Sequence, residues 1–266
     1  MTPLAGLIAA LLYIVASLTL GRHLARREAP NTRLILALGM VALPLHLISV
    51  HAAIYQPDGL NLGLFHVISL VGWLIATLAI GMSLYQPVVT LTLGAFPLAA
   101  LGILLSQYGN APYEPLRDLS HGAESHILLS ILAYSVLTIA AAQAILLAIQ
   151  DRHLRRHKRG ILNTLPPLVT MERLLFDLIA VGLALLTLAI LTGFLTLQNF
   201  FAQHLAHKTA FTLTSWVVFA VLLAGRHWLG WRGVTAIRFT LWGFALLLLG
   251  FYGSKIVLEL ILHQPV

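Results

Sequence analysis

The sequence has no cysteine and very little charge. Without cysteine the chain can form no disulfide, no thiolate metal site and no C-x-x-C-H haem attachment site, so any iron would need histidine or oxygen ligands. Charged residues make up 9% of the 266 residues, against about 25% in an ordinary soluble domain. Apolar residues make up 59%, and the mean hydropathy is +0.91. So much apolar surface indicates a protein whose solvent is lipid.

The basic residues do not indicate a nucleic-acid partner. The formal net charge is +7, from 16 Lys and Arg against 9 Asp and Glu. These residues form short clusters between long apolar runs and no continuous basic face, so we expect them to report membrane orientation instead.

Eight apolar runs have the length of a bilayer-spanning helix, which needs about 20 residues. They are continuous, whereas the strands of a membrane barrel alternate apolar and polar residues. We therefore predict an all-α, polytopic membrane bundle of eight transmembrane helices in one domain, residues 1–266. The predicted spans are Pro3–Gly21, Leu34–Tyr55, Leu64–Tyr85, Pro87–Leu105, His126–Ile149, Leu174–Leu197, Thr209–Gly225 and Phe239–Leu262.

The loops differ strongly in basic charge. One side holds thirteen Lys and Arg, the other holds Arg117 and Lys208, and Lys255 lies within the last span. By the positive-inside rule the thirteen are cytoplasmic, and both termini are extracytoplasmic. The thirteen are Arg22, Arg26, Arg27, Arg33, Arg152, Arg155, Arg156, Lys158, Arg159, Arg173, Arg226, Arg232 and Arg238.

Histidines gather on the opposite side. Four of the twelve lie among the cytoplasmic charges, and eight lie in the outer half or outside it. Neutral imidazoles are good iron ligands, although any single loop histidine can equally be a polar residue at headgroup level. The eight are His46, His51, His66, His121, His126, His204, His207 and His263.

His46 and His126 are the main candidate metal ligands. His46 lies about 18 Å along its span from Leu34, and Pro44 before it predicts a local kink that opens the helix. His126 begins its span, where the helix dipole favours the neutral ring. The alternatives are a packed histidine bonded to a neighbouring helix for His46, and a headgroup-level residue for His126. His204 and His207, three residues apart, could share one ion.

The last span carries a polar stripe. Tyr252, Lys255, Glu259 and His263 fall on one helical face. Lys255 can pair with Glu259, which is the structural interpretation, or meet a ligand carboxylate such as a haem propionate, which is the functional one.

Several segments resemble the cytochrome c assembly family. They are HILLSILAYS (126–135), LPPLVTMER (165–173), HKT (207–209), WVVF (216–219), GWRG (230–233) and YGSK (252–255). The resemblance covers nearly the whole chain and is strongest to the small HemX-like or YpjD-type branch of eight-span bacterial inner-membrane proteins. It implies haem handling, with His126 matching an outer histidine and His46 a membrane-embedded haem histidine.

One departure limits that implication. Larger family members carry a tryptophan-rich outer segment, whereas the corresponding stretch here, residues 200–210, contains no tryptophan. We therefore do not expect cytochrome c synthase or haem-export activity, while haem binding in the bundle remains expected. His207 lies in this stretch and is a candidate substitute ligand.

The prediction is a non-enzymatic protein that binds b-type haem non-covalently and acts as an accessory in haem handling or cytochrome complex assembly. No paired carboxylates, nucleophile–base set or phosphate loop points to catalysis. The expected cofactor-binding residues are His46, His126, Lys255 and His207. The expected partners are lipid, haem and another membrane or assembly protein. The alternative is a membrane accessory subunit, or an ion or metal transport protein, without haem.

Overall fold

The computed structural model is almost entirely helical where it describes the chain. It describes residues 2–26, 28–110, 115–117, 119–155, 167–196, 203–253 and 255–256, with main chain alone for 203–206. Within these ranges, eight helices are long and apolar enough to cross a membrane, which confirms the predicted all-α, eight-span architecture.

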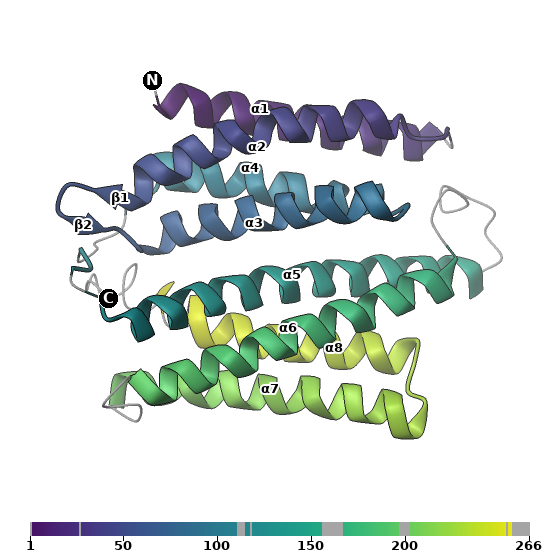
Figure 1. The fold of residues 1–266 in the computed structure, drawn as a ribbon. Helices are drawn as coiled ribbons and strands as arrows, with labels where there is room; N and C mark the ends of the chain where they lie inside the picture. The colour runs from purple at the N-terminus through teal and green to yellow at the C-terminus, as the bar shows by residue number, and fades with distance from the viewer. Residues whose placement is uncertain are drawn as a thin grey trace. The chain divides into compact units, whose positions relative to one another are not determined.

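The helices occur in the order shown in Figure 1. A short antiparallel hairpin, β1 (Tyr55–Gln56) and β2 (Gly59–Leu60), joins the second and third helices. A 3-10 turn, η1 (Val89–Leu91), precedes the fourth helix, and a π-helical turn, η3 (Leu249–Gly253), follows the last. The helices are α1 (Thr2–Arg26), α2 (Thr32–Ile54), α3 (Leu64–Tyr85), α4 (Thr92–Tyr108), α5 (His121–Arg155), α6 (Leu168–Thr196), α7 (Gln203–Leu229) and α8 (Val234–Leu248).

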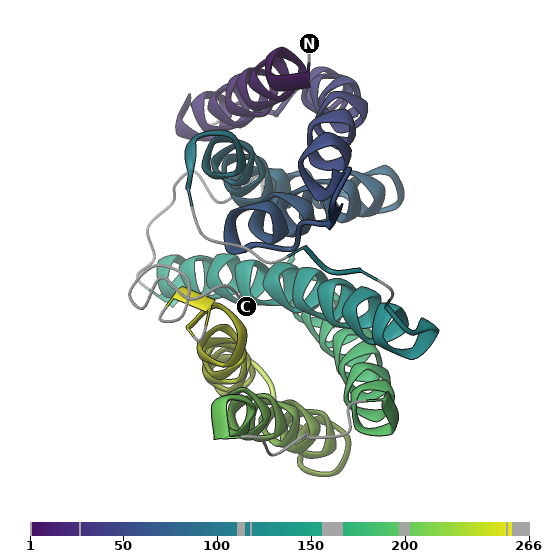
Figure 2. The same ribbon diagram turned by 90° about the vertical axis from the view of Figure 1, so that its left-hand side faces the viewer.

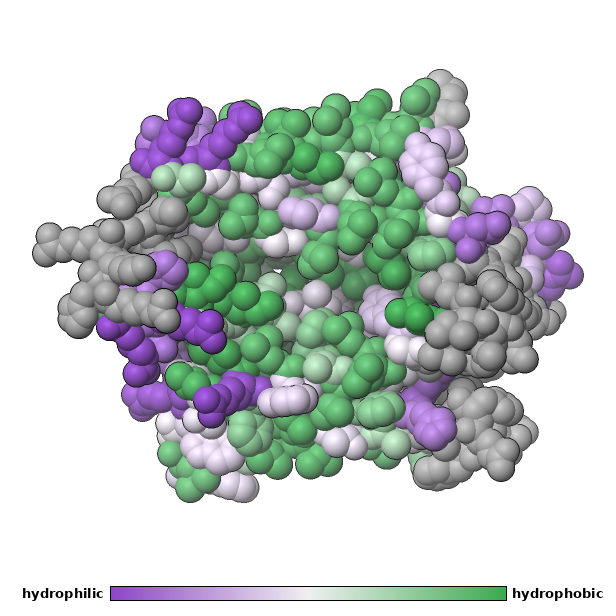
Figure 3. All heavy atoms as spheres, turned by 180° about the vertical axis from the view of Figure 1, so that it is seen from behind, coloured by the Kyte–Doolittle hydropathy of each residue, from purple (hydrophilic) through white to green (hydrophobic). Residues whose placement is uncertain are grey.

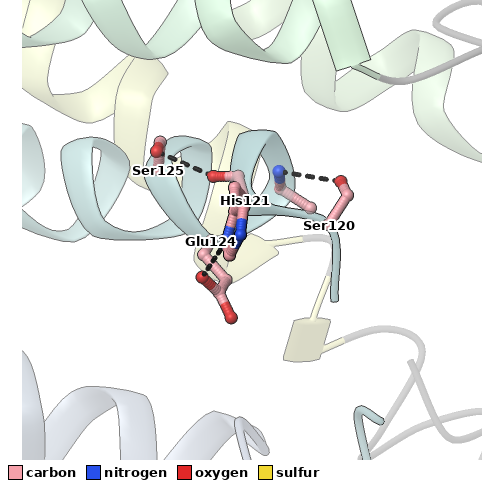
Figure 4. Close-up of polar contacts among 5 residues, drawn as sticks. Ser120, His121, Glu124 and Ser125 are labelled. Atoms are coloured by element: carbon pink, nitrogen blue, oxygen red, sulfur yellow. Dashed lines mark hydrogen bonds and ion pairs between the residues drawn. The ribbon is translucent and has the colours of Figure 1, made fainter. Parts of the chain in front are cut away.

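The start of α5 differs from the prediction. The helix begins five residues before His126, because the hydroxyl of Ser120 caps it by accepting the main-chain N–H of Ala123 at 3.3 Å. Figure 4 shows this first turn, where the Ser125 hydroxyl donates to the carbonyl of His121 at 2.8 Å. His126 therefore lies in the second turn, where the helix dipole acts more weakly than the prediction assumed.

Helices α6, α7 and α8 also begin earlier than predicted. Helix α6 starts at Leu168 and α8 at Val234, and α7 starts at Gln203, so His207 lies within it. Hydropathy marks the part of a helix that lies in lipid, and polar turns extend the helix beyond that part.

The chain divides into two compact units, which are described separately. The first comprises Met1–Arg117 with Arg152–Pro167, and the second comprises Asp118–Asp151 with Leu168–Val266. In the first unit α1 packs on α2 and α4, and α3 packs on α4. A Cβ atom on Gly102 would lie 3.1 Å from the Cα atom of Ser69, so α4 approaches the main chain of α3 closely. Figure 2 shows the helices turned by 90°.

In the second unit, α7 packs on α6 and α8. Helix α5 is joined to α6 by a hydrogen bond from the Gln143 amide to the carbonyl of Met171 (3.0 Å). It is joined to α8 by one from the Tyr134 hydroxyl to the carbonyl of Leu247 (3.0 Å).

The helix surfaces suit a lipid environment. Leu4, Leu11 and Leu18 repeat every seven residues along one face of α1 and are between 56% and 64% exposed. Along the helices in Figure 3, hydrophobic residues occupy the middle and hydrophilic residues lie toward the ends. This distribution is that of helices surrounded by hydrocarbon.

Candidate functional site

His46 is completely buried in the first unit. Its Nε2 lies 3.1 Å from the hydroxyl of Ser69 on α3, and its ring has no exposed surface. The edge of its ring meets Tyr13 of α1, with the ring centroids 5.8 Å apart. The Nδ1 atom has no hydrogen-bond partner among the residues that the structure describes. Of the two interpretations, the hydrogen bond to Ser69 is the one expected of a packed histidine, and iron ligation stays a prediction.

Helix α2 continues through Pro44, two residues before His46. A proline inside a helix removes one main-chain donor. Beside it, the indole N–H of Trp73 on α3 donates to the carbonyl of Leu43 at 3.0 Å. Helix α3 therefore contacts this part of α2 through Trp73 as well as through Ser69.

His126 is half-buried on α5 in the second unit. Its Nδ1 lies 2.7 Å from the carbonyl oxygen of Ala189 on α6. A carbonyl only accepts hydrogen bonds, so Nδ1 carries a proton, and in the neutral ring the lone pair is on Nε2. An imidazole whose second nitrogen donates to a carbonyl is oriented in the way that metal-binding histidines usually are.

The other predicted residues lie in the second unit. His207 is exposed on α7, and Lys255, just beyond η3, is 7% exposed. Glu259 and His263 lie outside the described residues, as does the side chain of His204. The predicted Lys255–Glu259 pair and the predicted His204–His207 pair therefore stay predictions.

The structure assigns His46 to one unit and His126, His207 and Lys255 to the other. The joint ligation of one iron by His46 and His126 would be a relation between the units, so it also stays a prediction. In the described part of the chain, no group of three or more His, Cys, Asp or Glu side chains could hold a metal ion. A haem iron takes only one or two protein ligands, so each imidazole can be judged by itself.

By that criterion the two histidines differ. His126 is half-buried and has its lone pair on Nε2, which fits an axial ligand. His46 is enclosed, with Nε2 bonded to Ser69 and Tyr13 against the ring. A macrocycle could reach it only if α1 and α2 packed differently.

Sequence reasoning missed two groups of polar residues. Tyr13 is fully buried, and its hydroxyl has no partner within the described ranges; a tyrosine at the middle of an apolar run is the signal that could have marked it. Glu172 forms an ion pair of 2.9 Å with Arg226 of α7 and also accepts the main-chain N–H of Gly233 at 3.3 Å. Its only sequence signal is an acidic residue among basic ones.

The fold and these histidines define a polytopic helical membrane protein that carries imidazoles inside its bundle. The profile of the family described as Cytochrome C assembly protein matches residues 34–262. The chain belongs to that family, which confirms the resemblance in the sequence.

Its relatives include Inner membrane protein YpjD of Escherichia coli (strain K12), 31% identical over 268 residues that cover 97% of this chain and 99% of that protein. The chain is also similar to the 28.8 kDa protein in the nifR3-like 5′ region of Azospirillum brasilense. That protein is 29% identical over 199 residues, or 70% of this chain and 73% of the relative. No solved structure matches significantly.

Proposed function

We propose that the protein binds haem non-covalently in a bacterial inner membrane and serves haem handling or cytochrome complex assembly as an accessory without catalytic activity. Family membership supports the connection with cytochrome assembly. The inner-membrane location follows from the name of the relative YpjD together with the eight apolar helices.

The observation that carries the proposal is the hydrogen bond from His126 Nδ1 to Ala189. Because this bond keeps a proton on Nδ1, Nε2 is the nitrogen that a metal would bind in the neutral ring. Bound haem would supply an iron that can change its oxidation state.

The remaining site residues have secondary roles in this proposal. Lys255 would hold a propionate, since its ammonium is the charge that complements a carboxylate. His46 and His207 are the candidates for a second axial position. His207 is exposed and needs no change in helix packing to be reached, whereas His46 does.

The test is an absorption spectrum of protein expressed with haem supplementation and purified in detergent. We expect a Soret band at close to one haem per chain, strongly reduced in His126→Ala. His153→Ala, an exposed histidine farther along the same helix, should retain the wild-type haem content. Comparing His46→Ala with His207→Ala then identifies the second ligand.

Two results would contradict the proposal: wild-type protein without pigment, or equal haem content in His126→Ala and His153→Ala. Stabilisation by a divalent metal without any chromophore would instead favour the transport alternative.

The orientation can be tested separately, because the chain has no natural cysteine. We propose that the cluster of thirteen basic residues is cytoplasmic. A membrane-impermeant maleimide applied to spheroplasts should label Arg117→Cys and spare Arg22→Cys. The opposite labelling pattern would invert the orientation.

A further inference from the structure

Two buried aromatic side chains adjoin in the first unit, and the described residues offer one polar atom of each no hydrogen-bond partner. These atoms are the hydroxyl of Tyr13 on α1 and Nδ1 of His46 on α2, and both side chains are 0% exposed. The two rings meet edge to face at 73°. Phe96 of α4 lies against the other side of Tyr13, with the ring centroids 5.0 Å apart.

Such an arrangement is costly unless something else completes it. A buried donor or acceptor without a partner loses its hydration and gains nothing in return, and hydrocarbon around the helices offers no replacement. One such atom can be a tolerated defect, whereas two on adjoining rings from different helices point to a partner that they share.

The two groups are complementary in chemistry. A phenol O–H donates, and an imidazole nitrogen without a proton accepts. If Nδ1 accepts, Nε2 carries the proton and donates to the hydroxyl of Ser69, which agrees with their 3.1 Å separation. A partner that accepts from Tyr13 and donates to His46 therefore satisfies both of the atoms that lack a partner.

Charge restricts what this partner can be. Residues 2–21, 34–54 and 64–108 contain no Lys, Arg, Asp or Glu, so an ion beside Tyr13 and His46 would be buried without a counter-charge. One imidazole and one phenol are also too few ligands for a cation.

We propose that Tyr13 and His46 form a small polar site inside the α1–α4 unit that binds one neutral, hydrogen-bonding molecule of the size of water. The molecule links α1 to α2 and continues through His46 to Ser69 of α3. In the haem-free protein this molecule occupies Nδ1 of His46 while Ser69 occupies Nε2. The site belongs to the protein without haem, so its test is independent of the proposed function.

The first test asks whether Tyr13→Phe lowers or raises the Tm of haem-free protein in detergent. Tyr13→Phe removes only the hydroxyl. If that hydroxyl is bonded to the molecule, we expect Tm to fall by about 2–4 °C, as for the loss of one hydrogen bond in a chain of this size. If the hydroxyl has no partner, its removal relieves a penalty, so an unchanged or higher Tm would overturn the proposal.

Two tyrosines provide matched controls. Tyr134→Phe removes a buried hydroxyl that donates to Leu247 and should lower Tm. Tyr108→Phe removes one from a residue that is 71% exposed and should leave Tm unchanged. The proposal requires Tyr13→Phe to behave like Tyr134→Phe.

The second test distinguishes a bound molecule from a direct bond between the two side chains. In ¹⁵N-histidine-labelled protein in nanodiscs, with His46 assigned by His46→Gln, we expect proton-detected solid-state NMR to show a cross-peak between the His46 ring and water. The cross-peak should disappear in Tyr13→Phe. A cross-peak to the Tyr13 hydroxyl instead, or none at all, would overturn the proposal.

Discussion

The two units hold their buried histidines by different partners. In the first, His46 faces the hydroxyl of Ser69; in the second, His126 faces the carbonyl of Ala189. A hydroxyl can donate or accept, so it leaves the histidine proton free to sit on either nitrogen, whereas a carbonyl determines its position. In its neutral form, the buried histidine can therefore carry its proton on either nitrogen in the first unit, whereas the carbonyl partner places it on Nδ1 in the second.

The units also differ in how they are held together. The second unit contains the ion pair between Glu172 and Arg226. The guanidinium of Arg226 also lies 4.6 Å from the ring centre of Phe176. The predicted spans of the first contain no charged residue at all. Its helices depend on close main-chain approach at glycine and on neutral hydrogen bonds. The following variants test this contrast.

The largest stability effect is expected in the second unit. Glu172→Gln keeps the shape of the side chain but leaves Arg226 without its counter-charge, and should reduce the free energy of unfolding by about 2–3 kcal/mol. Asp177→Asn, on an exposed position of the same helix, is the control and should have no effect. Thermal unfolding in detergent, followed by tryptophan fluorescence, measures both. If Glu172→Gln proved as stable as Asp177→Asn, the ion pair would not stabilise this unit.

A smaller loss is expected from Gly102→Ala in the first unit. The new methyl group would lie too close to the main chain of Ile68 and Ser69. It should reduce the free energy of unfolding by about 1–2 kcal/mol. Gly81→Ala is the matched control, since a Cβ there meets nothing within 4 Å and should gain up to about 1 kcal/mol from helix propensity. The same unfolding assay applies, and a loss in both variants would point to a general intolerance of alanine.

Ser69→Ala should lower the free energy of unfolding by about 1 kcal/mol, because it leaves Nε2 of His46 without its hydrogen-bond partner. Ser135→Ala, equally buried, removes a hydroxyl that only donates to the carbonyl of Ile131 in its own helix, and should change stability by less than about 0.5 kcal/mol. If both variants lose the same amount, the Ser69–His46 bond carries no special stability.

The smallest effect is one in which the two units should agree. Asn31 caps α2 through its side-chain oxygen, 3.2 Å from the N–H of Leu34, and Ser120 caps α5. Asn31→Ala and Ser120→Ala should each cost about 0.5–1 kcal/mol. Ser125→Ala should cost less, because Ser125 lies inside the helix rather than before it. A larger loss at Ser125 than at Ser120 would contradict the assignment of Ser120 as the cap of α5.

The eight spans could be predicted because each is a continuous apolar run, and lipid requires its main chain to be helical. The ends could not. The residues from His121 to Ser125 form no apolar run and look like loop, yet the Ser120 cap makes them the first turn of α5. Arg238 looked like the limit of the last span, but a charged residue near a helix end can reach water from within the helix.

The candidate site was predicted only in part. Pro44 and mid-span depth drew attention to His46, and its burial agrees with the packed alternative. The proton position of His126 depends on Ala189, which lies 63 positions away and becomes a partner only through the packing of α5 on α6. The contact of Tyr13 with His46 likewise depends on the packing of α1 on α2, which the sequence does not reveal.

The π-helical turn at the end of α8 has a consequence for reading the sequence beyond it. A π turn accommodates about one more residue than an α turn, so a side chain just after it is out of phase with those before it by up to about 100°. Tyr252 lies within this turn and Lys255 just after it. A helical wheel drawn across residues 249–253 therefore misassigns the face of Lys255 relative to the residues of α8.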